Sequence, residues 1–293
     1  MSFKSGFVAI VGRANVGKST LLNNIMGQKI SIVTDKAQTT RMRIQAVLNR
    51  DDGQIVFVDT PGMHKPKNRL GEFMVEEIDQ TMPEMDVILM MIDGSVGIGP
   101  GDEFMASRLP DRGTKILLIN KLDKMTAESF EAVKQDSQKL GEFDEILGIS
   151  ALDGVTIGSL PDKIMSYLPE GPAYFPEDQW TNLDLRTVVS EIIREKALMY
   201  LEQEIPHGIA IVIDTFDEEE ELTHIQATII VERDSHKGIV IGKGGRKLKG
   251  IGQQARKDIE ELLERQVYLE LWVKVRENWR RSPHHVADFG YKK

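Results

Sequence analysis

The sequence predicts two domains: an α/β domain with a mostly parallel sheet and one antiparallel edge strand, then a smaller α+β domain. The chain has 293 residues, which is longer than a domain with one hydrophobic core usually is. Its 41% hydrophobic content is typical of globular proteins. Apolar runs alternate with amphipathic stretches up to about residue 168, as in doubly wound sheets. Proline and glycine then interrupt the pattern. The expected boundaries are 1–169 for the first domain, 170–181 for a linker and 182–293 for the second domain.

The first domain contains five apolar runs that predict buried parallel strands, because they are aliphatic on both faces. These runs are Phe7–Val11, Ile55–Val58, Val87–Ile92, Lys115–Ile119 and Ile146–Ile149. The helices expected between them are Lys18–Met26, Arg69–Met82, Gly101–Arg108, Ala127–Leu140 and Ile157–Leu168. Met42–Arg50 alternates in polarity and precedes Asp51-Asp52-Gly53, which predicts a hairpin and an antiparallel edge strand.

The second domain has a different order of expected elements. The pattern predicts a helix at about Leu183–Glu202, strands at Ile209–Phe216 and Leu222–Val231, a Gly-rich turn, a helix at about Leu248–Glu264 and a strand at Val267–Val275. The net charge of the chain is −9, yet residues 235–293 hold 14 Lys and Arg against 7 Asp and Glu. This asymmetry predicts that the basic end meets a polyanion, the alternative being a chance cluster on a solvated face.

The composition also excludes some classes of function. The chain has no cysteine, which excludes a disulfide framework, a thiolate metal site and a cysteine nucleophile, and fits a reducing cytoplasm. No apolar run approaches the ~20 residues that span a bilayer. The first residues enter a strand instead of a signal peptide, so we expect an intracellular, soluble protein.

Residues Gly12–Ser19 read Gly-Arg-Ala-Asn-Val-Gly-Lys-Ser and match the phosphate-binding pattern G-x-x-x-x-G-K-[ST] between a strand and a helix. Glycines let backbone N–H groups surround phosphate oxygens, and the helix N-terminus adds partial positive charge. We expect Lys18 to bind the β- and γ-phosphates and Ser19 to ligate Mg²⁺. The alternative is a Gly-containing turn with a surface lysine, which the flanking strand and helix disfavour.

Asp59-Thr-Pro-Gly62 follows the strand Ile55–Val58 at the sheet edge where open α/β sheets bind ligands. We expect Asp59 to hold the Mg²⁺ shell and the Gly62 N–H to sense the γ-phosphate. Asn120-Lys121-Leu122-Asp123 follows another strand. The carboxylate of Asp123 only accepts hydrogen bonds, and guanine offers two donors where adenine does not, so the site predicts guanine. Ser150-Ala151-Leu152 then places a backbone N–H within reach of the guanine oxygen.

These motifs, in this order, are the signature of P-loop GTPases related to translation factors. The first domain is therefore expected to be a P-loop NTPase domain that hydrolyses GTP to GDP and phosphate. The residues expected to bind the nucleotide are Gly12, Asn15, Val16, Gly17, Lys18, Ser19, Thr20, Asp59, Gly62, Asn120, Lys121, Asp123, Ser150, Ala151 and Leu152.

The polar loop 28–41 fits switch I, in which a threonine completes the Mg²⁺ shell when the γ-phosphate is present. We favour Thr40 or Thr39, so that the expected metal ligands are Ser19, Thr40 and Asp59. Many GTPases place a glutamine after the glycine of the second motif, whereas this chain has Met63. Hydrolysis is therefore expected to be slow, with Lys18, Asn15, Thr40 and Gly62 as its candidate catalytic residues. His64 is read as an exposed loop residue.

Gly242-Lys243-Gly244-Gly245 forms a G-x-x-G motif followed by an amphipathic helix. In KH domains this loop clamps the backbone of about four nucleotides, so the second domain resembles a type II KH domain. An ordinary strand-to-helix turn is the alternative. The residues expected to bind RNA are Ile239, Ile241, Gly242, Lys243, Gly244, Gly245, Arg246, Lys247 and Lys249. Ile251 and Leu248 would complete an apolar floor, and Trp279 either stacks on a base or belongs to the core.

Gly12–Ser19, Lys36–Arg41 and Asp59–Gly62, together with the C-terminal half, resemble the bacterial Era family over essentially the whole chain. The resemblance implies binding of 16S ribosomal RNA near its 3′ end and a role in maturing the 30S subunit. It also motivates a K⁺ ion held partly by Asn15, the alternative being that Asn15 only satisfies its own loop. We expect a monomer.

Two other classes of function compete with this reading. The first is a nucleotide-gated signalling or cell-cycle protein, peripheral at the inner membrane surface, whose basic end meets anionic lipid. The second is an RNA-binding scaffold with a vestigial nucleotide site, which the intact Lys18, Ser19, Asp59, Asn120 and Asp123 disfavour.

Overall fold

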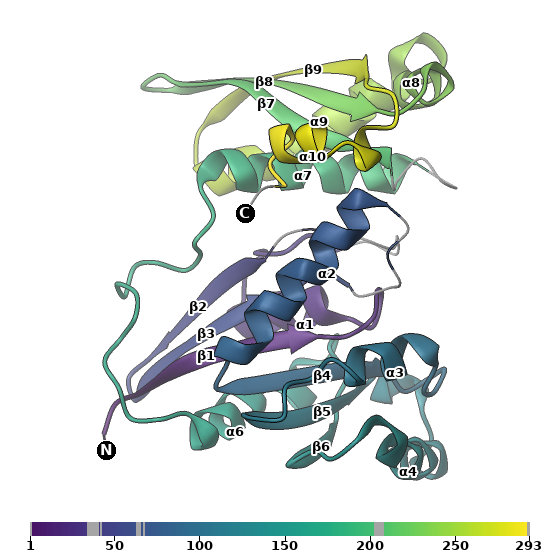
Figure 1. Cartoon of the computed structure of the whole chain (residues 1–293). Helices are drawn as coiled ribbons and strands as arrows, with labels where there is room; N and C mark the ends of the chain where they lie inside the picture. Colours follow the sequence, from purple (N-terminus) through teal and green to yellow (C-terminus); the bar gives the residue numbers. More distant parts are fainter. Residues whose placement is uncertain are drawn as a thin grey trace. The chain divides into compact units, whose positions relative to one another are not determined.

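The computed structural model describes residues 2–33, 41, 43–62, 66, 68–201 and 208–291. The chain forms two compact units that divide between Asn182 and Leu183 (Figure 1). The expectations for Thr39, Thr40, Met63 and His64 lie outside the described residues.

The first unit is built on a six-stranded sheet with the order β2-β3-β1-β4-β5-β6 (Figure 1). Its strands are β1 (Lys4–Val11), β2 (Ile44–Arg50), β3 (Gly53–Asp59), β4 (Val87–Asp93), β5 (Thr114–Asn120) and β6 (Glu145–Gly148). The pairs β3–β1, β1–β4, β4–β5 and β5–β6 are parallel, and β2–β3 is antiparallel. The expected parallel sheet with one antiparallel edge strand is therefore confirmed.

The helices of the first unit are α1 (Lys18–Met26), α2 (Arg69–Thr81), α3 (Pro100–Ala106), α4 (Ala127–Asp136), α5 (Gly154–Ile157) and α6 (Leu160–Tyr167). Two differ from the expected bounds because of proline. Pro83 ends α2 at Thr81, since the residue before a proline is disfavoured in a helix. Pro161 lies in the first turn of α6, where proline is tolerated, so the helix expected at Ile157–Leu168 is divided in two.

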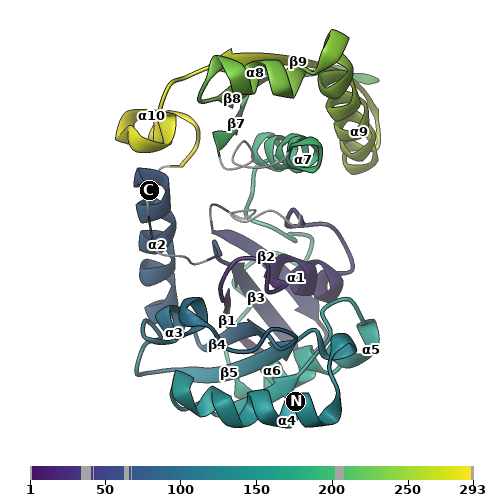
Figure 2. The ribbon, with the colours of Figure 1, turned by 90° about the vertical axis from the view of Figure 1, so that its right-hand side faces the viewer.

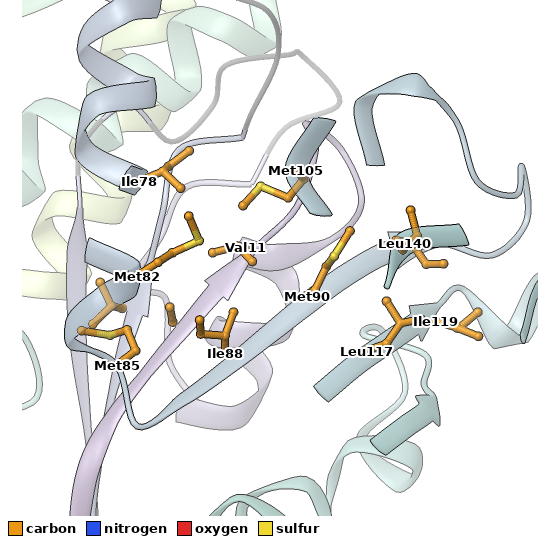
Figure 3. Close-up of a cluster of buried hydrophobic side chains, with 13 residues drawn as sticks. Val11, Ile78, Met82, Met85, Ile88, Met90, Met105, Leu117, Ile119 and Leu140 are labelled. Atoms are coloured by element: carbon orange, nitrogen blue, oxygen red, sulfur yellow. The ribbon is translucent and has the colours of Figure 1, made fainter. Parts of the chain in front are cut away.

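A cluster of buried apolar side chains fixes one face of this sheet (Figure 3). Met90 of β4 and Leu117 of β5 contribute to it from the sheet, Ile78 from α2 and Met105 from α3. Met90 and Met105 are fully buried. The cluster holds the strands in register, so that the loops at their carboxyl ends come together on one edge.

Residues 170–182, which we call the strap, include the segment expected as a linker and are bound along the first unit. The strap begins against β1, where the Gly171 N–H donates to the Phe3 carbonyl at 3.1 Å and the Ser5 hydroxyl to the Pro172 carbonyl at 2.7 Å. Gln54 of β3 is fully buried, and its side-chain oxygen accepts from the N–H groups of Tyr174 and Phe175 at 2.8 and 3.0 Å.

The far end of the strap pairs with the edge strand β2. The Val47 N–H donates to the Trp180 carbonyl at 3.0 Å, and the Thr181 hydroxyl donates to the Gln45 carbonyl at 2.9 Å. Thr181 also forms an antiparallel bridge with Ala46. The strap thus covers a strand edge that would otherwise leave backbone groups unpaired.

The second unit holds a three-stranded sheet with the order β7-β8-β9. Its elements are α7 (Leu185–Tyr200), β7 (Ala210–Glu218), β8 (Leu222–Val231), α8 (Asp234–Ile241), α9 (Arg246–Leu263), β9 (Gln266–Val275) and α10 (Pro283–Asp288). Strands β7 and β8 are antiparallel, and β8 and β9 are parallel. Helix α7 packs on β7, and α9 packs on β9 and on α7 (Figure 2).

Helix α8 stands where the sequence predicts only a Gly-rich turn. Its Ile239-Val240-Ile241 run is β-branched and contains no helical signal of its own. Strands β8 and β9 are parallel, and parallel strands need a crossover of a dozen or more residues. The helices α8 and α9 supply it, with the G-x-x-G loop between them.

Candidate functional site

The loop between β1 and α1 has the backbone that a phosphate cradle requires. Gly12 and Gly17 have φ values of +151° and +108°, and Asn15 has +64°. A Cβ atom at Gly12 would collide with the Met91 carbonyl oxygen, and one at Gly17 would collide with the Asn120 amide. Glycine at both positions therefore allows the loop to turn above the sheet, with α1 beginning at Lys18.

Lys18 is buried within this loop, with 6% of its surface exposed. Its ammonium donates to the carbonyl oxygens of Gly12 and Arg13 at 3.1 and 3.0 Å. Burial lowers the pKa of Lys18 to about 8, and the charge of Asp59 opposes that shift only in part. The site therefore has too little negative charge for this cation, and a bound phosphate would supply it.

Two hydroxyl groups converge on the carboxylate of Asp59. The Ser19 hydroxyl donates to its Oδ2 at 3.2 Å, and the Ser31 hydroxyl donates to the same oxygen at 2.8 Å. Hydroxyl and carboxylate oxygens suit Mg²⁺, which commonly takes its other ligands from phosphate and water. Across the described part of the chain, no group of three or more His, Cys, Asp and Glu is placed to hold a metal. Sequence reasoning missed Ser31, because a single serine in the polar loop 28–41 belongs to no recognisable motif.

Gly62 lies directly against the phosphate loop. A Cβ atom there would come within 2.9 Å of the Cα of Ala14, closer than real side chains allow. The absence of a side chain thus lets this backbone approach the place where a γ-phosphate would stand. The next residues, 63–65, lie outside the described part of the chain.

Asn120 joins the phosphate loop to the loop after β6. Its side-chain amide donates to the Val16 carbonyl at 2.7 Å, and its side-chain oxygen accepts from the Ala151 N–H at 2.8 Å. The Ala151 N–H, one of the three backbone groups in the segment expected to reach guanine, is therefore paired with Asn120. Asp123 is exposed and accepts from the Ser150 hydroxyl at 2.7 Å, which aims its carboxylate.

The remaining residues expected at the site lie close to these groups in the chain. Val16 is fully buried, Thr20 lies in the first turn of α1, and Leu152 is 75% exposed. Lys121 has a φ of +66°, and its ammonium pairs with Asp93. The structure thus brings together the described residues expected to bind the nucleotide, while Thr40 lies outside the described residues.

The G-x-x-G loop connects α8 to α9 and needs its glycines. Gly242, Gly244 and Gly245 have φ values of +71°, +61° and +73°. Lys243, Arg246 and Lys249 are exposed around it, whereas the half-buried Lys247 donates to the Tyr200 carbonyl at 3.4 Å. The loop and the first turn of α9 thus present three exposed cations beside an accessible backbone, as phosphate binding requires.

A groove of about 420 Å³ runs from this loop between α9 and β9. It is lined by Gly245, Leu248, Lys249, Gly252, Gln253, Arg256, Leu269 and Leu271. Sequence reasoning missed Gln253, Arg256 and both strand leucines, because their nearness to the loop depends on how β9 packs. Ile239 is 42% exposed, whereas Ile251 is fully buried, so the expectation of Ile251 in an exposed apolar floor is wrong.

Trp279 belongs to the core of the second unit. It is fully buried, its indole N–H donates to the Gly208 carbonyl at 2.9 Å, and its ring stacks on Tyr291. It does not offer a surface for stacking a base. His284 is exposed, and its Nε2 lies 3.2 Å from a carboxylate oxygen of Asp288. Within the described residues, no helix has the length and apolar character to cross a bilayer.

Comparisons with known proteins match both parts of the chain. Residues 7–121 match a family described as 50S ribosome-binding GTPase, and residues 204–280 match the KH domain. GTPase Era of Alkaliphilus oremlandii (strain OhILAs) is 53% identical over 294 residues, which cover 99% of this chain and 100% of that protein. GTPase Era of Alkaliphilus metalliredigens (strain QYMF) is 53% identical over 295 residues, with both chains covered completely.

Two solved structures are similar over the same length. Era in complex with MgGDPNP and nucleotides 1506–1542 of 16S ribosomal RNA has a TM-score of 0.96 and is 46% identical, covering 99% of this chain and 100% of that one. A variant of Aquifex aeolicus Era bound to GDP and AlF4⁻ has a TM-score of 0.95, again with 46% identity and 99% and 100% coverage.

Proposed function

The chain belongs to the Era family of GTPases, and we propose that it uses GTP to control its binding to single-stranded RNA near the 3′ end of 16S ribosomal RNA. We further propose that this binding serves maturation of the 30S subunit. The observation that carries the proposal is the relative solved with MgGDPNP and nucleotides 1506–1542, which covers 99% of this chain. The phosphate loop, Asn120 and Asp123 support the nucleotide half independently.

The proposed nucleotide site consists of the residues predicted from the sequence, with Ser31 added beside Mg²⁺. Lys18 neutralises the phosphates, and Ser19 and Asp59 hold the metal shell. Asp123 selects guanine, and Asn120 fixes the two loops on either side. Thr40 or Thr39 completes the metal shell in this proposal. Mg²⁺ itself is supported by the relative that was solved with MgGDPNP.

Potassium is a second proposed ion, held partly by Asn15. The left-handed backbone of Asn15, with φ of +64°, places its side chain at an unusual turn of the phosphate loop. A monovalent cation there would stabilise the negative charge that develops in the transition state, for which Met63 offers no polar group. Turnover is expected to be faster in KCl than in NaCl, and Asn15→Ala should remove the difference. Equal rates in all four conditions would reject K⁺.

The proposed RNA site extends beyond the predicted residues. The loop Gly242–Gly245 would clamp the sugar-phosphate backbone, with Lys243, Arg246 and Lys249 as its cations. Gln253 and Arg256 continue this surface along α9. We propose residues 1–169 as the GTPase domain and 182–293 as the KH domain, acting as a cytoplasmic monomer.

The experiment measures fluorescent GDP and GTP binding, phosphate release and RNA affinity with purified protein. We expect GTP to be preferred over ATP, and an RNA of the 16S 3′ end to bind better than a scrambled RNA. The double variant Lys243→Asp, Gly244→Asp should abolish RNA binding while leaving GTP turnover in the absence of RNA unchanged. A preference for ATP, or equal binding of both RNAs, would reject the proposal. Sedimentation with anionic vesicles, with RNA as competitor, tests peripheral membrane contact separately.

Coupling between the two units should be reciprocal, because a ligand that favours one arrangement is itself favoured by it. Such coupling is typically worth about 1–3 kcal/mol, roughly 5–150-fold in affinity. The strap is bound to the first unit up to Asn182, and Asp184 caps α7, which begins at Leu185, so the chain passes from one unit to the other at Leu183. RNA affinity that is equal with a GTP analogue, GDP and no nucleotide would exclude the coupling.

A further inference from the structure

Asp93 ends β4 next to the loop that recognises the base. It is paired with Asn120 in the register of β4 and β5. Its Oδ2 lies 2.5 Å from the ammonium of Lys121, and its Oδ1 accepts from the Ser95 N–H and hydroxyl at 3.1 and 2.6 Å. Oδ1 of Asp93 thus stabilises the turn after β4, and Oδ2 holds the ammonium of Lys121 in the loop 120–123, which we call the base loop.

Lys121 is held in an unfavourable backbone conformation. Among the residues that the structure describes, four that are not glycine have a positive φ, and two of them, Asn15 and Lys121, lie in the nucleotide loops. Such a conformation persists only where the surroundings impose it, and it gathers at functional sites. The Leu122 N–H donates to the Ile149 carbonyl at 3.0 Å, which fixes the chain on one side of Lys121. Asp93 fixes its side chain.

The turn after β4 packs against the same loop. The Gly94 N–H donates to the Asn120 carbonyl at 2.9 Å, and a Cβ atom at Gly94 would collide with Met125. The side chain of Asp93 is 11% exposed and that of Lys121 is 28% exposed, so water screens their pairing only in part. Burial opposes the charge of Asp93, yet hydrogen bonds from Lys121 and Ser95 keep its pKa below the usual value.

We propose that Asp93 is a positioning residue for guanine nucleotides, which holds Lys121 so that the loop 120–123 is already in its binding geometry. This inference rests on the proposed nucleotide site. The effect is the same for GDP and GTP, because the loop recognises the base and lies apart in sequence from the groups that contact the γ-phosphate. An interaction that is equal in the ground and transition states changes affinity and leaves kcat unchanged.

The test compares Asp93→Asn with the wild-type full-length chain. The asparagine keeps the shape and the bonds to Ser95 but loses the charge that holds the ammonium. We expect dissociation of fluorescent GDP and of a fluorescent GTP analogue to quicken by about tenfold each, the range of a partly screened charged hydrogen bond. At saturating GTP, kcat should stay within about twofold. The control is Glu145→Gln, which breaks a similar pair with Lys163 at 2.7 Å on β6 and α6.

A double-mutant cycle separates positioning from a general loss of stability. Lys121→Met should quicken dissociation by itself, and adding Asp93→Asn to it should change nothing further. Independent effects, a kcat loss as large as the affinity loss, or dissociation from Asp93→Asn equal to wild type would overturn the inference. If Asp93→Asn melts earlier than wild type, the Lys121→Met background decides the test, because a general loss of stability would quicken dissociation there as well, whereas a loss of positioning would not. Failure of the wild-type chain to bind GDP would instead reject the proposed function.

Discussion

The side-chain amide of Asn120 donates to the Val16 carbonyl oxygen at 2.7 Å and thereby joins the base loop to the phosphate loop. The oxygen of the same amide accepts from the Ala151 N–H, and only 2% of Asn120 is exposed. One side chain therefore supports three segments that are far apart in the sequence. The geometry of the nucleotide site depends on it before any ligand binds.

Asn120→Ala should weaken GDP binding by about 100-fold, or ~3 kcal/mol, because it removes two buried hydrogen bonds and leaves both partners unpaired. Titration with fluorescent GDP measures this loss. Asn49→Ala is the control, since Asn49 bonds the Glu177 carbonyl at 2.8 Å within the same unit. If both variants bind GDP with equal affinity, Asn120 does not organise the site.

The lowered pKa of Lys18 predicts that the stability of the fold and the binding of phosphate depend on pH. Burial lowers its pKa to about 8 in the folded chain, against an ordinary lysine pKa of 10.5. The unfolded chain therefore holds more protons between these two pH values, so Lys18 makes stability rise as pH increases from about 8 to 10.5. Below pH 8 the buried cation costs the most, and a phosphate that pairs with it removes that cost.

Binding of GDP above about pH 8 should then take up a substantial part of a proton, because phosphate restores the charged form of Lys18. Calorimetry in two buffers with different ionisation enthalpies measures this uptake. Near pH 7 the uptake should be much smaller, since Lys18 is already mostly charged there. An uptake that does not change between these pH values contradicts the role of Lys18.

Local signals explain which parts of this architecture the sequence predicts. The segments 12–19, 59–62 and 120–123 each combine a fixed motif spacing with a flanking strand. Both the spacing and the strand can be recognised without knowing how distant parts of the chain pack. Ser31 and Asp93 act through residues far along the chain, so no local pattern marks them. The proline and glycine content of the strap predicts an irregular segment, but it does not show whether that segment is free or bound. Its partners Gln45 and Gln54 lie more than 100 residues earlier.

The strap yields a prediction about stability. Gln54→Leu should lower the free energy of unfolding of the first unit by about 3 kcal/mol, because it leaves two N–H groups and the Phe175 carbonyl without their buried partner. Urea unfolding followed by tryptophan fluorescence measures it, Trp180 lying in the strap itself. Thr181→Val removes one hydrogen bond and should cost ~1 kcal/mol. Equal costs for the two variants would mean that Gln54 does not anchor the strap.

Arg256 gives the sharpest test of the RNA surface, since it lines the groove beyond the G-x-x-G loop. Its guanidinium lies 3.8 Å from Glu260, at the edge of an ion pair, and is 54% exposed. We expect Arg256→Ala to weaken binding of an RNA from the 16S 3′ end and to reduce the slope of log affinity against log salt by about 1, the loss of one phosphate contact. Fluorescence anisotropy at several salt concentrations measures both.

Lys257→Ala is the matched control for Arg256, because Lys257 is the next residue on α9, carries the same charge and does not line the groove. Each variant removes one positive charge from the second unit, so a long-range field effect would weaken RNA binding equally in both. A contact within the groove affects Arg256→Ala alone. Equal salt slopes in the two variants would therefore place the RNA away from the α9–β9 groove and confine its contacts to the loop Gly242–Gly245.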